Sequence, residues 1–240
     1  MKTIFTKVFL IFPTIILILA PKENLSAQSF ANLDFEAANI PSSTQPSSTV
    51  PISESLRGWS GYIGGVQQTV AYYDISALDT SRISIIDHDA RFNQYPGVLQ
   101  GNYTALLSAG LGGDTTLSQT GLVPFGTQSL LFRAFPDLGS DIQFPGSFAV
   151  TLGGQTLALT VLGSGTNYTW YGADINSWAN QTTDLNFTLI AQKPYNSRIY
   201  FLSLDSIQFS TQPIPEPSGL ALLGVGALLL DFFCRRNSSR

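Results

Sequence analysis

The only histidine of the chain, His88, lies between two acids in the run Asp87-His88-Asp89. A carboxylate beside an imidazole is an arrangement that general acid–base catalysis and metal binding both use. A catalytic site would also need a nucleophile or a second converging acid, and no Gly-x-Ser-x-Gly turn accompanies this histidine. We therefore expect no catalytic residues here and interpret the run as a polar turn after a strand.

Two pairs of neighbouring aromatic residues, Tyr72-Tyr73 and Trp170-Tyr171, have the chemistry to stack on sugar rings. Neighbours along a strand point to opposite faces of the sheet, so one member of each pair would be exposed. These four residues are candidate ligand-binding residues for an extracellular polysaccharide. Packing in the core is the alternative for each of them.

The C-terminal segment 213–240 begins with an acid between two prolines, Pro215-Glu216-Pro217. Proline fixes φ, lacks an amide proton and keeps the preceding residue extended. Glu216 is therefore presented on a stiff, non-helical segment that a processing enzyme can read.

An apolar run over residues 219–233 follows this motif, and Arg235 and Arg236 come after it. A helix of this length would measure roughly 22 Å, which is short for a membrane span. The positive-inside rule predicts that the arginines lie on the cytoplasmic side of the inner membrane, with the rest of the chain outside.

This order of features resembles the PEP-CTERM sorting domain of Gram-negative and related bacteria. The resemblance implies that an exosortase recognises the motif, cleaves nearby and moves the protein to the cell surface or into the extracellular matrix. The recognised residues would be Pro215, Glu216 and Pro217, with Arg235 and Arg236 as the stop signal. A plain single-span membrane anchor is the alternative.

The N-terminal residues 1–27 have the pattern of a secretory signal peptide. Lys2 and Lys7 precede an apolar run over residues 8–20, and Ala27 offers a small residue for cleavage. We therefore expect Sec-type export of the remaining chain.

The exported part, residues 28–212, holds six lysines or arginines against thirteen acids, a net charge of -7. No basic patch could neutralise phosphates, so nucleic acid is excluded as a partner. The only cysteine, Cys234, lies in the tail. The exported domain therefore has no internal disulfide and depends on core packing, with a metal ion as a further stabiliser.

Short apolar alternating runs separated by Gly-rich turns predict an all-β, antiparallel sandwich over residues 28–212. Residues 30–36 are expected to form its first strand and the Pro-, Ser- and Thr-rich residues 39–55 a flexible loop. Later strands are expected at 68–73, 82–86, 103–108, 115–119, 128–134, 147–152, 155–161, 168–172, 184–190 and 199–209. Gly153-Gly154 predicts a tight hairpin.

Parts of these strands resemble the ectodomains of PEP-CTERM proteins, which are similar to galactose-binding-like jelly rolls and carbohydrate-binding modules. The likeness lies in residues 115–120, 129–133, 173–182 and 204–209. It implies a jelly-roll fold in which acids of the first and last strands hold a structural Ca²⁺, and here those acids are Glu36 and Asp205.

We therefore expect an exported surface or matrix protein with a non-enzymatic, structural or adhesive role. A carbohydrate-binding module for extracellular polysaccharide is the alternative. A polysaccharide hydrolase is less favoured, because only Glu36 and Glu54 are glutamates in the exported part and a glycosidase needs a closely placed carboxylate pair.

Overall fold

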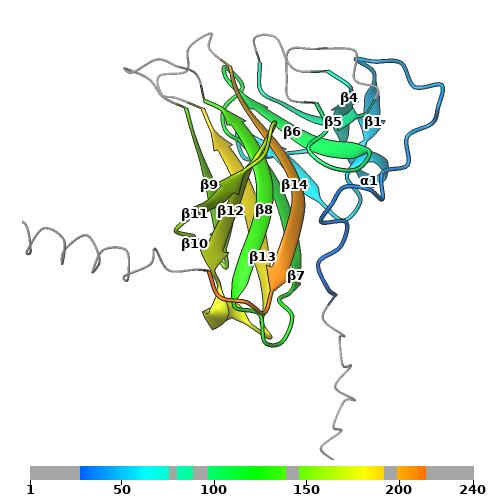
Figure 1. The fold of residues 1–240 in the computed structure, drawn as a ribbon. Coiled ribbons are helices and arrows are strands. Elements are labelled where there is room, and N and C mark those ends of the chain that lie inside the picture. Colours follow the sequence, from blue (N-terminus) through cyan, green and yellow to red (C-terminus); the bar gives the residue numbers. More distant parts are fainter. Residues whose placement is uncertain (1–27, 76–79, 89–96, 139–145, 192–198, 215–240) are drawn as a thin grey trace, which may run out of the picture.

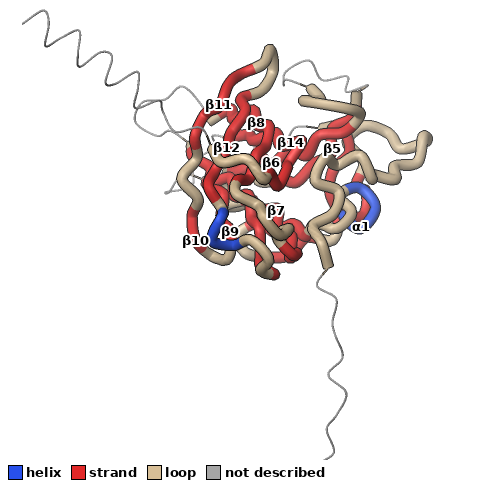
Figure 2. Tube along the Cα trace, turned by 60° about the horizontal axis from the view of Figure 1, so that its bottom comes forward, coloured by secondary structure: helices blue, strands red, loops and turns tan. Residues whose placement is uncertain are grey.

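The computed structural model describes residues 28–75, 80–88, 97–138, 146–191 and 199–214. These residues form two β-sheets that pack face to face, and Figure 1 shows the sandwich from the side with most of its strands running along its length. Figure 2 shows it from a direction closer to its end.

The larger sheet has eight strands in the order β1-β4-β5-β6-β14-β8-β12-β11. Its strands are β1 (Thr49–Pro51), β4 (Val70–Tyr73), β5 (Arg82–Asp87), β6 (Tyr103–Ala109), β14 (Tyr200–Ser210), β8 (Ser129–Asp137), β12 (Thr169–Asp174) and β11 (Thr160–Ser164). All neighbours pair antiparallel except β4 and β5, which pair parallel.

The smaller sheet has six antiparallel strands in the order β10-β9-β13-β7-β2-β3. Its strands are β10 (Gln155–Thr156), β9 (Ser147–Leu152), β13 (Thr182–Ile190), β7 (Thr115–Leu122), β2 (Ser60–Ile63) and β3 (Val66–Gln68). Two short helical turns complete the described structure, α1 (Ile52–Ser55) and the 3-10 turn η1 (Asn176–Trp178).

The predicted all-β sandwich is confirmed. Each sheet buries one face, so alternate side chains of a strand enter the core: Leu130, Phe132 and Ala134 of β8 are all fully buried. The predicted hairpin at Gly153-Gly154 is also confirmed, because both glycines have positive φ (58° and 75°) between paired Leu152 and Gln155.

Aromatic rings join the two sheets through the core. Phe187 of β13 is fully buried, with its ring centroid 5.1 Å from that of Phe132 and 6.2 Å from that of Trp59. Phe35 extends the contacts, with its centroid 5.7 Å from that of Trp59. These contacts bring together strands of both sheets and the N-terminal segment without any covalent link.

The predicted first strand is wrong, because residues 30–36 form turns. Asn32 and Phe35 have positive φ (50° and 60°), which a strand does not allow. Asn32 stabilises the turns by accepting a hydrogen bond from Ala37 N (2.9 Å) and donating one to Arg57 O (3.0 Å). The apolar residue of the pattern, Phe35, is nevertheless fully buried.

Residues 39–55 are not a loop throughout, since they end in β1 and α1. Val50 and Ile52 are buried and tie this part to the core. Pro51 precedes the first helical residue and accepts a hydrogen bond from Ser55 Oγ (3.0 Å). Two buried aliphatic side chains therefore order a segment whose composition is typical of loops.

The signal peptide, the sorting motif and the expected membrane helix over residues 219–233 lie outside the described residues. Within the described ranges, no helix is long and apolar enough to cross a membrane.

We predict that Phe187→Ala lowers the free energy of unfolding by about 3–5 kcal/mol, since it leaves a cavity between the sheets. Phe125→Ala is the matched control, because Phe125 is 87% exposed in the turn before β8, and its effect should stay within about 0.5 kcal/mol. Denaturant unfolding of both variants measures the difference, and equal losses would contradict the described core.

Candidate functional site

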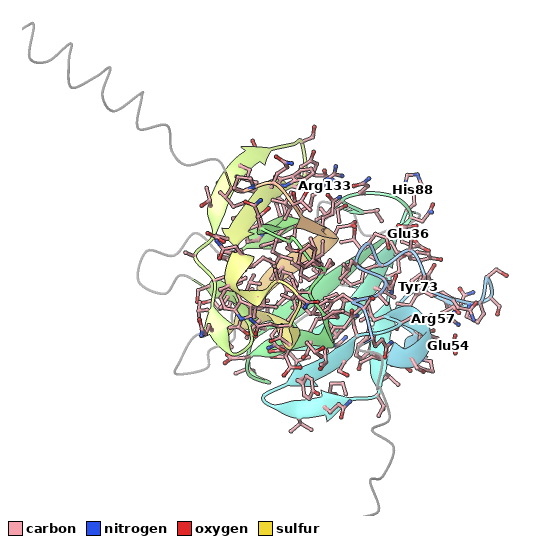
Figure 3. The ribbon with its side chains drawn as sticks, turned by 90° about the horizontal axis from the view of Figure 1, so that it is seen from below. Glu36, Glu54, Arg57, Tyr73, His88 and Arg133 are labelled. Atoms are coloured by element: carbon pink, nitrogen blue, oxygen red, sulfur yellow. The ribbon has the colours of Figure 1, made fainter. Side chains whose placement is uncertain are left out.

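The outer face of the larger sheet carries a cluster of two aromatic rings and one cation, Tyr168, Trp170 and Arg133. The Cζ atom of Arg133 lies 4.6 Å from the ring centroid of Tyr168 and 5.0 Å from that of Trp170. Each contact is a cation–π interaction, so the guanidinium lies over both rings. Figure 3 shows Arg133 well apart from the Glu54–Arg57 pair.

A groove of about 400 Å³ lies beside these rings. Its lining residues are Leu131, Leu162, Gly163, Ser164, Tyr168 and Trp170. Gly163 pairs with Trp170 across β11 and β12. Because glycine has no side chain, it leaves the indole ring uncovered on that side. We call these residues, with Arg133, the aromatic groove.

Tyr171 lies on the opposite face of β12 and packs into the sandwich. Its ring stacks on Phe132 with centroids 5.4 Å apart and meets the edge of Phe148 at 5.5 Å. Trp170 therefore lies in the groove and Tyr171 in the core, as the alternation of a strand requires. Tyr171 is not positioned to stack on a ligand.

The neighbouring residues Tyr72 and Tyr73 also lie on opposite faces of their sheet. Tyr73 packs against the core and its hydroxyl donates a hydrogen bond to the Asp87 carboxylate. Burial, followed by this hydrogen bond and by the charge of Asp87, raises the pKa of Tyr73. Tyr72 points outward, with Arg82 Cζ 4.5 Å from its ring centroid. Arg82 lies over Tyr72 much as Arg133 lies over Tyr168 and Trp170, but Tyr72 does not line the aromatic groove.

A second, polar pocket of about 470 Å³ contains both predicted calcium ligands. Glu36 accepts hydrogen bonds at Oε1 from the backbone N–H groups of Asn102 (2.7 Å) and Tyr103 (3.0 Å). Its Oε2 accepts from Asn102 Nδ2 (2.9 Å). The Glu36 carboxylate therefore holds the turn that leads into β6.

Asp205 holds the same turn from the other side. Its Oδ2 accepts from Gln100 N (3.0 Å) and Thr104 Oγ1 (2.7 Å), and its Oδ1 accepts from Ser206 N (2.6 Å). The side chain is almost fully buried, at 1% exposed. Burial raises the pKa of Asp205 to about 6, although the hydrogen bonds from Thr104, Ser206 and Gln100 oppose the shift.

These oxygens can supply part of a calcium site. Ca²⁺ takes six to eight oxygen ligands, and Glu36 Oε2 and Asp205 Oδ1 are the carboxylate oxygens with the fewest short donors. Among the described residues, no three His, Cys, Asp or Glu side chains come together to hold a metal. A cation here would depend on backbone carbonyls, Gln100 and water for its other ligands, so calcium stays a prediction.

The remaining acids and the histidine lie elsewhere. His88 is exposed in the turn after β5, as expected, and lines a shallow pocket with Asp87, Asn102 and Tyr103. Glu54 is a partly exposed residue of α1 whose carboxylate accepts from Arg57 Nη2 (2.8 Å) and Asn39 Nδ2 (3.0 Å). Neither residue lines the pocket of Glu36.

The sequence interpretation did not single out Tyr168 or Arg133. Tyr168 is two residues before Trp170 in the same predicted strand. Alternation along the strand therefore could have indicated that both rings lie on the same face of the sheet. Arg133 could not be found in this way, because it meets the rings only through the register of β8 with β12, in which it pairs with Trp170.

No protein-family model matches the chain, and the search of curated proteins found no match. Among solved structures, the chain is similar to the enzymatically active domain of tailspike protein 4 of bacteriophage CBA120, with 13% identity and a TM-score of 0.40. This match covers 76% of the chain and only 21% of the tailspike chain. The chain is also similar to TmCBM61 in complex with β-1,4-galactotriose, with 12% identity, a TM-score of 0.33, and coverage of 76% and 99%.

We predict that the buried Asp205 makes the metal-free protein lose stability as the pH rises from about 4 to about 6. Below the unfolded pKa of 3.8 the carboxyl is protonated in both states; between 3.8 and about 6 only the folded state keeps the proton. The loss should be roughly 3 kcal/mol. Urea unfolding with chelator present measures the free energy of unfolding at each pH. It should fall with rising pH in the wild type, and Asp205→Asn should lack this slope whatever its overall stability. The same slope in both proteins would contradict the assignment.

The calcium prediction has a separate test. If Ca²⁺ binds between Glu36 and Asp205, millimolar calcium should raise the thermal midpoint by several degrees, since a ligand bound only by the folded state stabilises it. Glu36→Gln should reduce the rise, and Glu54→Gln, on an acid that does not line this pocket, is the control. An identical thermal midpoint with calcium and with chelator would contradict the predicted calcium site.

Proposed function

We propose that this chain is an exported, non-enzymatic protein of the cell surface or extracellular matrix, and that its sandwich binds an extracellular polysaccharide through the aromatic groove. The sandwich would be of the jelly-roll type that the sequence resemblance implies. The observation that carries the proposal is the pair of rings, Tyr168 and Trp170, on the open face of one sheet.

The chemistry of the groove suits a sugar chain. The faces of pyranose rings are apolar and stack on aromatic side chains, while the hydroxyls need polar partners at the rim. Trp170 and Tyr168 supply the rings, and Ser164 lies exposed beside them. Arg133 has a buried Nε that makes no hydrogen bond to any described residue. The positive charge of the guanidinium favours a ligand that carries carboxylate or hydroxyl oxygens.

The tail provides the route to the surface. Pro215-Glu216-Pro217, the apolar run over 219–233 and the arginine pair Arg235 and Arg236 support sorting by an exosortase after Sec-type export. Before processing, the apolar run would anchor the chain in the inner membrane.

We predict that Trp170→Ala and Tyr168→Ala each weaken binding to the cognate polysaccharide by at least about tenfold, because each removes a stacking face. Tyr62→Ala is the matched control, since Tyr62 lies on the smaller sheet, away from the groove. Affinity electrophoresis in gels cast with acidic and neutral polysaccharides measures the retardation. Retained binding in both groove variants would exclude this surface.

The sorting proposal predicts the mass of the exported protein. The mature protein should lack residues 1–27 and the arginines Arg235 and Arg236, because cleavage near the motif removes the helix. Intact-mass measurement on protein from the cell surface reads this directly. A mature chain that retains both arginines would show a simple membrane anchor instead.

A further inference from the structure

Arg133 carries a positive charge that is not paired with any acid among the described residues. This part of the chain contains three arginines, Arg57, Arg82 and Arg133, and no lysine. Arg57 forms an ion pair with Glu54 (2.8 Å). Arg133 forms none with any described residue, and Figure 3 shows it apart from Glu36 and Glu54. The charge of Arg133 is therefore available to a ligand.

The acid best placed to pair with Arg133 is engaged elsewhere. Asp205 of β14 lies opposite Arg133 of β8 in the register of the two strands, and side chains at such positions share a face with Cβ atoms about 4.5–5.5 Å apart. The Asp205 carboxylate instead accepts hydrogen bonds from Gln100 N, Thr104 Oγ1 and Ser206 N. Arg133 extends the other way, over the two rings of the aromatic groove. The fold thus uses the acid and leaves the cation at the groove.

The rings hold the guanidinium in place and leave its hydrogen-bond donors unsatisfied. A cation–π contact acts on the charge and supplies no acceptor lone pair for the N–H groups. Nε is buried, so contact with a ligand falls to the N–H groups of Nη1 and Nη2, which can bind both oxygens of a carboxylate. Because the side chain is already ordered over Tyr168 and Trp170, it loses little rotamer entropy when a ligand binds.

The groove beside these rings is open and contains no acidic side chain that would repel an anion. Trp170 lies between Arg133 on β8 and Gly163 on β11, its partners in the two strand pairings. No atom of the described residues lies within 4 Å of the position that a Cβ of Gly163 would take. A sugar ring on the indole therefore has room on the Gly163 side, and the guanidinium Cζ is 5.0 Å from the indole centroid.

We propose that the aromatic groove selects acidic polysaccharides, with a uronic acid residue stacked on Trp170 and its carboxylate paired to the Arg133 guanidinium. This inference rests on the proposed polysaccharide function and names the class of sugar. The rings supply binding that acidic and neutral sugars share, and Arg133 determines the preference. The net charge of -7 on the exported part predicts the opposite, a general repulsion of polyanions.

Three acidic polymers, each compared with its neutral counterpart, test the preference in the wild-type protein. Polygalacturonate, alginate and hyaluronate are compared with their carboxyl-reduced forms, in which a hydroxymethyl group replaces each carboxylate. Affinity electrophoresis of the full chain in detergent, with chelator present, measures binding. At least one acidic polymer should bind at least about tenfold more tightly than its reduced form, because a charged hydrogen-bonded pair is lost on reduction.

The outcomes separate this inference from the proposed function. Reduced forms that bind as tightly as the acidic polymers would overturn the preference and leave polysaccharide binding standing. Absence of binding to all six polymers would refute both. Gly163→Val should weaken binding of acidic and reduced forms alike, because the side chain fills the groove; the open space at Gly163 and its ordinary φ allow valine without strain.

Substitution of Arg133 then tests its role. Arg133→Gln should reduce binding of the acidic polymer to that of its reduced form, whose own binding should stay nearly unchanged. Arg82→Gln is the matched control, because Arg82 lies over Tyr72 on the same face of the sheet and its loss changes the net charge equally.

Arg133→Lys keeps a cation at the rings and serves if Arg133→Gln does not fold. It should still reduce the preference, because lysine lacks the planar pair of donors that fits a carboxylate. An unchanged preference in the folded Arg133 variants, or an equal loss in Arg82→Gln, would overturn the assignment to Arg133.

Discussion

The contact of Phe187 with Phe132 and Trp59 is the interaction on which the rest of the sandwich depends. It joins the smaller sheet to the larger one, and the described residues contain no cysteine that could do so covalently. Phe132 also supports Tyr171, whose inward position determines that Trp170 faces outward. The direction of the ring that we propose for sugar binding is therefore set by aromatic packing inside the core.

The two acids at the polar pocket show how hydrogen bonds can hold carboxylates in place. Glu36 and Asp205 come from distant parts of the chain and hold opposite sides of one turn, between Gln100 and Thr104. Carboxylates that accept several N–H and O–H donors are stabilised in their charged form, and this opposes the cost of burying Asp205. The turn is fixed in this way whether or not a cation adds to the site.

Strand alternation was enough to predict most of the sandwich, because each strand buries one face and the pattern survives in the sequence. It placed Trp170 and Tyr171 on opposite faces. It failed at Phe35, where a buried aromatic between acids looks like a strand but lies in a turn made by positive φ values. It also gave no warning of the bulge in β14 between Asp205 and Gln208, which depends on pairing with β8. Arg133 was not predicted for the same reason. Its contacts with Tyr168 and Trp170 depend on the register between β8 and β12, which the sequence of one strand does not show.

After β14 the chain turns back over the outer face of the larger sheet, where Ser129 Oγ donates to Gln212 O and Ile214 lies against Gly172. In the proposed membrane-anchored form, this turn would limit how far the domain can stand from the bilayer. With the expected membrane helix beginning at Gly219, only four residues separate it from Ile214, which is seated on the sheet. The five Cα–Cα steps from Ile214 to Gly219 reach at most about 18 Å when the chain is fully extended. The unprocessed protein would therefore lie with the outer face of its larger sheet close to the lipid headgroups. A bulky polysaccharide would have little room to reach that face. Release from the membrane would make the face accessible to it.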